Sequence, residues 1–136
     1  MESLTIYCGL RPDVPNTMQL KEHFSVVESF KWNPQKVLLY LDVCQGDSTS
    51  ITGDQLLKKL WHKRVLNANV IDFLLVHQHL IPEEWKDKRV FFWGTTYSRN
   101  GRILVPCIAW CYDKWERRYR QLRSYWFNDA PAAILE

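Results

Sequence analysis

Glycine and long apolar runs are both scarce in this sequence, and each scarcity excludes a class of function. No stretch approaches the roughly 18 to 20 apolar residues of a membrane span. The amino terminus lacks the charged region and the long apolar region of a signal peptide. The five glycines are too scattered to form a P-loop or a GxGxxG turn, which argues against nucleotide hydrolysis and dinucleotide chemistry. We therefore expect a cytoplasmic protein that does not associate with membranes.

Motifs for metal binding and nucleophilic catalysis are missing as well. The only close histidine pair, His77 and His79, falls at an expected helix end, where the helix dipole favours an imidazolium, and no HExxH motif accompanies it. Cys107 and Cys111 would lie about 13 Å apart in an extended segment, too far to share a disulfide or a metal. We expect four buried free thiols, no metal, no cofactor and no catalytic residue. A small cysteine- or histidine-dependent enzyme is the less favoured alternative.

Length and composition fit a single α+β domain. A chain of 136 residues that is 46% hydrophobic can bury a core without disulfide or metal support. We expect one domain over residues 1–136. It would consist of an N-terminal strand-helix-strand portion (1–50), a central helical pair (51–87) and an aromatic-rich, C-terminal antiparallel three-stranded meander (88–136).

The first portion is expected to contain two strands around a helix. Residues 4–8 alternate and are rich in strand formers. Asn16 and Gln19 resemble a capping box and predict a helix of two to three turns. The run 36–43 is apolar on both faces, which predicts a central strand covered on both sides.

Two helices and one further helical turn are expected in the second portion. Thr52 and Gln55 form a capping-box pattern, and Asn67 or Asn69 is a good N-cap for the second helix, which would end before Pro82. Pro82 and the acidic residues after it suggest one more turn. The first helix is expected to bury Leu56, Leu57, Leu60 and Trp61 on one face.

From Arg89 onward the hydrophobic period changes to two, which predicts strands. Asn100-Gly101 is the strongest short hairpin signal in the sequence and leads into a strand over 103–112. Pro106 cannot donate a hydrogen bond to a strand neighbour, so we expect it at a bulge or a poorly paired strand start. Residues 115–126 fit a helix slightly better than a strand by periodicity, with a turn at Asp113-Lys114 in the strand alternative.

Three runs carry a resemblance: LNANVIDFLL at 66–75, LIPEEWK at 80–86 and VFFWGT at 90–95. In these runs the C-terminal half of the chain resembles a family of small uncharacterised bacterial proteins. That family places further tryptophans in alternation after the position of Trp115, so the resemblance implies a third strand over 115–126. Arg117 stands at one such position here. The resemblance implies no function.

Basic residues are concentrated in the C-terminal portion, where residues 86–126 hold ten Lys or Arg against three acidic residues. The aromatic residues of this portion are expected mainly in the core. Alternatively, one sheet face stays open and presents rings and guanidinium groups to a partner. We then predict a non-catalytic interaction module for a macromolecular partner, with a protein slightly preferred and single-stranded nucleic acid as the alternative. The expected binding residues are Arg99, Arg102, Trp115, Arg117, Arg118, Tyr119, Arg120 and Arg123.

Overall fold

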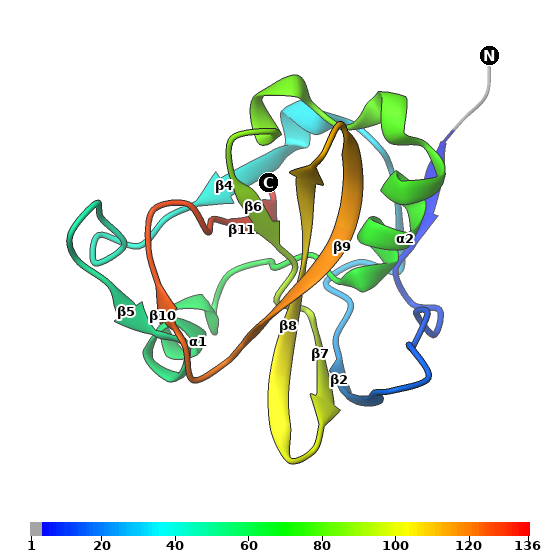
Figure 1. Cartoon of the computed structure of the whole chain (residues 1–136). Helices are drawn as coiled ribbons and strands as arrows, with labels where there is room; N and C mark the ends of the chain where they lie inside the picture. Colours follow the sequence, from blue (N-terminus) through cyan, green and yellow to red (C-terminus); the bar gives the residue numbers. More distant parts are fainter. Residues whose placement is uncertain (1–3) are drawn as a thin grey trace.

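A curled seven-stranded sheet organises residues 4–136, the part of the chain that the computed structural model describes (Figure 1). The strand order is β2-β7-β8-β6-β11-β4, and β9 pairs with β8 outside this path. All of these pairings are antiparallel except β11 with β6. The strands are β2 (Gln19–His23), β4 (Val37–Tyr40), β6 (Arg89–Phe91), β7 (Thr95–Arg99), β8 (Arg102–Cys111), β9 (Lys114–Gln121) and β11 (Ala132–Leu135). The expected lack of a signal peptide involves residues 1–3, which lie outside the described residues.

Two small antiparallel ribbons and five helical segments complete the α+β fold. The ribbons pair β1 with β3 and β5 with β10. Their bounds are β1 (Thr5–Tyr7), β3 (Ser29–Lys31), β5 (Ile51–Thr52) and β10 (Tyr125–Trp126). The helices are α1 (Gly53–Leu60) and α2 (Ala68–Val76), with the 3-10 turns η1 (Pro34–Lys36), η2 (Gln78–Leu80) and η3 (Glu83–Trp85). Among the described residues, no helix is long and apolar enough to span a bilayer.

Both helix starts follow the capping signals in the sequence. Gln55 N–H donates to Thr52 Oγ1 at 3.3 Å while Thr52 N–H donates to Gln55 Oε1 at 3.4 Å, so the capping box of α1 is confirmed. Asn67 caps α2 by accepting from Asn69 N–H at 3.1 Å. The predicted buried face of α1 is half wrong. Leu56 and Leu60 are buried, but Leu57 and Trp61 lie about 100° further round the helix and are exposed.

Two expectations for the first portion are wrong. Residues 19–23 form β2 rather than a helix, because pairing with β7 outweighs a short apolar stripe with a weak capping pattern. The strand predicted over 36–43 exists as β4, but it lies at the sheet edge instead of the centre. The C-terminal strand β11 inserts between β6 and β4, a non-local pairing for which the sequence carries no local signal.

The C-terminal hairpins confirm the strand alternative for residues 115–121, which lie in β9, whereas residues 122–124 form a turn and 125–126 belong to β10. Asn100 and Gly101 have φ of 52° and 77° and form the tight turn of the β7–β8 hairpin. The β8–β9 turn uses Tyr112 and Asp113, also at positive φ, one residue earlier than expected. The expected three-stranded meander is part of the larger sheet and not a unit of its own, because β8 also pairs with β6.

The strand expected from Arg89 to Tyr97 is interrupted at residues 92–94, and this break accommodates Pro106. Phe92 N–H donates to the Pro106 carbonyl at 3.0 Å. The nitrogen and the carbonyl of a strand residue face the same neighbouring strand, so the Pro106 nitrogen, which carries no hydrogen, faces the break between β6 and β7. No hydrogen bond between strands is lost at this position, so proline is tolerated there. Pro106 thus lies inside β8 and not at the expected bulge or strand start. Gly94 sits in the break because an added Cβ would lie 2.8 Å from Asn67 Cβ.

Apolar clusters cover both faces of the sheet. Adjacent β8 residues alternate between them: Ile108 packs in the cluster containing α2, and Cys107 in the cluster containing α1. Trp85, Trp93, Trp115 and Trp126 are each at most 6% exposed, so these rings form core. Neither face of the central sheet is therefore left as an open aromatic platform.

Candidate binding surface at the β7–β8 hairpin

The predicted binding residues on β9 are divided between two faces of the sheet. Trp115, Arg117 and Tyr119 alternate onto the face that α2 covers, whereas Arg118 and Arg120 point to the other face. The register pairs Arg117 with Ile108 and Arg118 with Cys107, which lie in opposite clusters. The strand thus does not present one continuous basic face.

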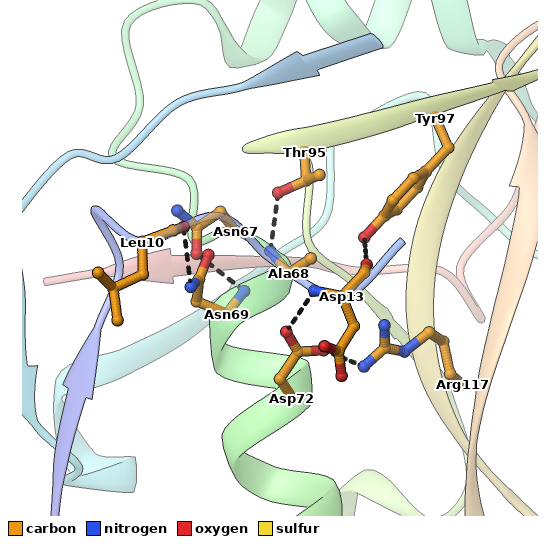
Figure 2. Close-up of polar contacts among 9 residues, drawn as sticks. All are labelled: Leu10, Asp13, Asn67, Ala68, Asn69, Asp72, Thr95, Tyr97 and Arg117. Carbon is orange, nitrogen blue, oxygen red and sulfur yellow. Dashed lines mark hydrogen bonds and ion pairs between the residues drawn. The ribbon is translucent and has the colours of Figure 1, made fainter. Parts of the chain in front are cut away.

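Arg117 is bound by Asp72 of α2 (Figure 2). The guanidinium donates to Asp72 Oδ1, and the two side chains are only 15% and 23% exposed. Burial alone would lower the pKa of Arg117, but the Asp72 carboxylate outweighs it and raises that pKa above its ordinary value. Arg117 is consequently engaged within the fold and is not available to a partner.

The same region ties the amino-terminal segment to α2 through polar contacts that sequence reasoning missed. Asn69 Nδ2 donates to the Tyr7 carbonyl at 3.1 Å. It also donates to the Leu10 carbonyl, and Tyr97 donates its hydroxyl proton to the Asp13 carbonyl, each at 3.1 Å (Figure 2). Asp13 N–H in turn donates to Asp72 Oδ2 at 3.1 Å. Apart from the N-cap signals at Asn67 and Asn69, the sequence gives no sign of these contacts between distant segments.

The other expected residues on β9 are also engaged, although Arg118 is exposed. Arg118 donates to Glu116 at 2.9 Å, and Arg120 lies 3.7 Å from Asp129 and 5.1 Å from the ring centroids of Phe91 and Trp126. Trp115 is buried, and Tyr119 packs edge-on against Tyr97 with centroids 5.6 Å apart. These contacts stabilise the sheet.

Arg99, Arg102 and Arg123 differ from the others. All three are exposed, and none forms an ion pair within residues 4–136. Arg99 and Arg102 are direct cross-strand partners beside the hairpin turn. Like charges in this position repel and weaken a hairpin, so the arrangement is not explained by stability.

Two hollows that share Arg102 and Gln121 have these three arginines in their lining, and we call this region the arginine hollow. The first, of about 410 Å³, is lined by Arg102 and Arg123 together with Asp54 of α1. The second, of about 320 Å³, is lined by Arg99 and Arg102, and Gln121 contributes to both. The first hollow is lined by residues of the β7–β8 hairpin, of the link between β9 and β10, and of α1. Guanidinium groups bind carboxylates or phosphates through two parallel hydrogen bonds, so this geometry suits an anionic group.

The thiols and histidines lie apart from the arginine hollow. Burial raises the pKa of Cys8 to about 11 and of Cys107 to about 12. Cys44 is exposed and Cys111 partly so, which corrects the expectation of four buried thiols. The rings of His77 and His79 are 6.3 Å apart. In the part of the chain that is described, no group of three His, Cys, Asp or Glu side chains could hold a metal ion.

No protein-family model matches this chain, and no curated protein or solved structure matches it either. The resemblance to small bacterial proteins therefore stays a prediction. What can be inferred about function depends on the arginine hollow itself.

Proposed function

We propose that this protein is a non-catalytic interaction module that binds an acidic segment of a partner protein in the arginine hollow. The observation that carries the proposal is that three exposed arginines, Arg99, Arg102 and Arg123, line two hollows that share Arg102, and that none of the three forms an ion pair among residues 4–136. Arginine is enriched at the energetic centres of protein interfaces and binds carboxylates in a fixed geometry. An acidic partner would also relieve the repulsion between Arg99 and Arg102.

Single-stranded nucleic acid is the second candidate, because the same groups can bind phosphates. Sequence-tolerant binding of single strands relies on exposed rings on which successive bases stack. Trp115 is buried and Tyr119 half-buried, so they offer no such platform. Tyr125, two residues after Arg123, and Trp61 at the end of α1 are exposed, but they come from two different elements and are not neighbouring positions on one sheet face. This difference favours a protein partner.

Charge removal at the hollow tests the proposal. Titration of a fluorescein-labelled poly-glutamate peptide should give saturable binding to the wild type and at least tenfold weaker binding to the double variant Arg102→Gln/Arg123→Gln. The matched control is Lys31→Gln/Lys36→Gln, which removes the same charge from exposed residues that line a different hollow. Equal weakening by both variants would mean that only net charge matters and would overturn the proposal. Tighter binding of a single-stranded oligonucleotide, with a steep loss of affinity as salt rises, would favour the second candidate.

A further inference from the structure

α1 carries an exposed apolar stripe that begins at the arginine hollow. Asp54, Leu57 and Trp61 are spaced by three and four residues and therefore lie along one side of the helix. Asp54 lines the first hollow, Leu57 is 40% exposed and Trp61 is 75% exposed. With a rise of 1.5 Å per residue, Trp61 lies roughly 10 Å along the helix axis from Asp54. The stripe thus runs along α1 from Asp54, which lines the first hollow together with Arg102 and Arg123.

The fold does not use this stripe. α1 packs on the sheet through Leu56 and Leu60, which are buried in the cluster around Trp126. Trp61 is the C-cap residue with helical dihedral angles, so its side chain continues the exposed side of α1. A single exposed apolar side chain needs no explanation. Here, however, two lie in line with a charged hollow, and tryptophan is the residue type most enriched at binding hot spots.

We infer that the arginine hollow and the Leu57–Trp61 stripe form one docking surface for an extended peptide that carries acidic residues followed by an apolar side chain. Charge complementarity orients the peptide, because its carboxylates bind Arg102 and Arg123 while Asp54 repels them from the start of α1. An extended chain advances about 3.3 Å per residue, so the roughly 10 Å between Asp54 and Trp61 is spanned by about three residues, and we place the apolar residue about three positions beyond the acid at the Asp54 end of the hollow. Trp61 is the anchor at that end.

This inference rests on the proposed function, and a peptide pair separates the two. The first peptide has four consecutive glutamates, two serines and a phenylalanine; the second replaces the phenylalanine with serine. The wild type should bind the first peptide about tenfold more tightly than the second, the gain expected from burying one such ring. Trp61→Ala should remove this preference while binding the second peptide normally. The control variant is Tyr112→Ala, which removes another exposed ring at the distant β8–β9 turn and should retain the preference.

Quenching of tryptophan fluorescence by acrylamide gives an independent reading of the same contact. The first peptide should shield the wild type from acrylamide, and this shielding should vanish in Trp61→Ala. Both peptides could bind the wild type equally, with Arg102→Gln/Arg123→Gln weakening the binding of both. That result would show that the stripe does not belong to the binding surface, and only the proposed function would stand. If neither peptide binds, the proposed function fails as well. Oligonucleotide binding that depends on Trp61 would overturn the peptide assignment.

Discussion

Asp72 of α2 and Arg117 of β9 form an ion pair that joins the second helix to the edge of the central hairpin. The carboxylate also accepts from Asp13 N–H, so one side chain connects three segments that are distant in sequence. Because both partners are mostly buried, removal of one leaves a poorly solvated charge on the other. We therefore regard this pair as a structural contact and not as part of the binding surface.

Breaking this pair should destabilise the fold. We expect Asp72→Ala to lower the free energy of unfolding by about 2 kcal/mol, and Asp72→Ala/Arg117→Met to lower it by less than the two single variants together. Urea denaturation followed by circular dichroism measures these values. Strict additivity would show that Asp72 and Arg117 do not interact in solution.

Two glycine substitutions should lower the free energy of unfolding by very different amounts. A Cβ at Gly53 would lie 1.7 Å from the Leu122 carbonyl oxygen, where the start of α1 meets the β9–β10 link. A Cβ at Gly101 meets nothing within 4 Å, although its φ of 77° is strained for alanine. We expect Gly101→Ala to cost roughly 1 to 2 kcal/mol and Gly53→Ala distinctly more. Thermal melts of the two variants test this order, and the reverse order would contradict the close approach of α1 to the β9–β10 link at Leu122.

Asp42 should make stability depend on pH in the acid range. Burial raises its pKa, but hydrogen bonds from Cys44 N–H and from the Tyr40 hydroxyl outweigh this and lower the pKa below its ordinary 3.8. A lowered folded-state pKa contributes stability that is complete above the unfolded-state pKa and is lost as the pH falls through the folded-state value. The wild type should therefore lose more unfolding free energy than Asp42→Asn between pH 5 and about pH 2 to 3. If the unfolding free energies of the two proteins depend on pH in the same way, Asp42 does not contribute to acid destabilisation.

Three of the four thiols should fall into two classes of reactivity. Cys44 is exposed, whereas burial raises the pKa of Cys8 to about 11 and that of Cys107 to about 12. Because the thiolate is the reactive form, iodoacetamide at neutral pH should alkylate Cys44 first and leave Cys8 and Cys107 unmodified until the protein unfolds. Mass spectrometry of peptides over time identifies the order. Early modification of Cys107 would mean that β8 is more open than the structure shows.

Local signals in the sequence were sufficient for the elements that depend on neighbouring residues. Thr52, Asn67 and Asn100-Gly101 fix two helix starts and one hairpin through contacts within a few residues. The position of β4 and the conversion of 19–23 to a strand depend on β11 and β7, which are distant in sequence, and no local pattern reveals such pairings.

The site was predictable only in part, for a similar reason. Alternation along a strand already places Arg117 and Arg118 on opposite faces, so a single basic face was incompatible with the strand that we expected. The partners Asp72 and Asp129 come from other elements and could not be seen in the sequence. Arg99 and Arg102 are exposed because they lie at the ends of β7 and β8 beside the hairpin turn, and Arg123 because it lies in the turn between β9 and β10.

Chemical-shift mapping by NMR tests binding at the arginine hollow most directly. On addition of the acidic peptide to uniformly ¹⁵N-labelled protein, we predict that the amide shifts which change most belong to residues 99–103 and 121–124 and to the first turn of α1. Shifts confined to other surfaces, or no saturable shifts at all, would contradict binding at this site.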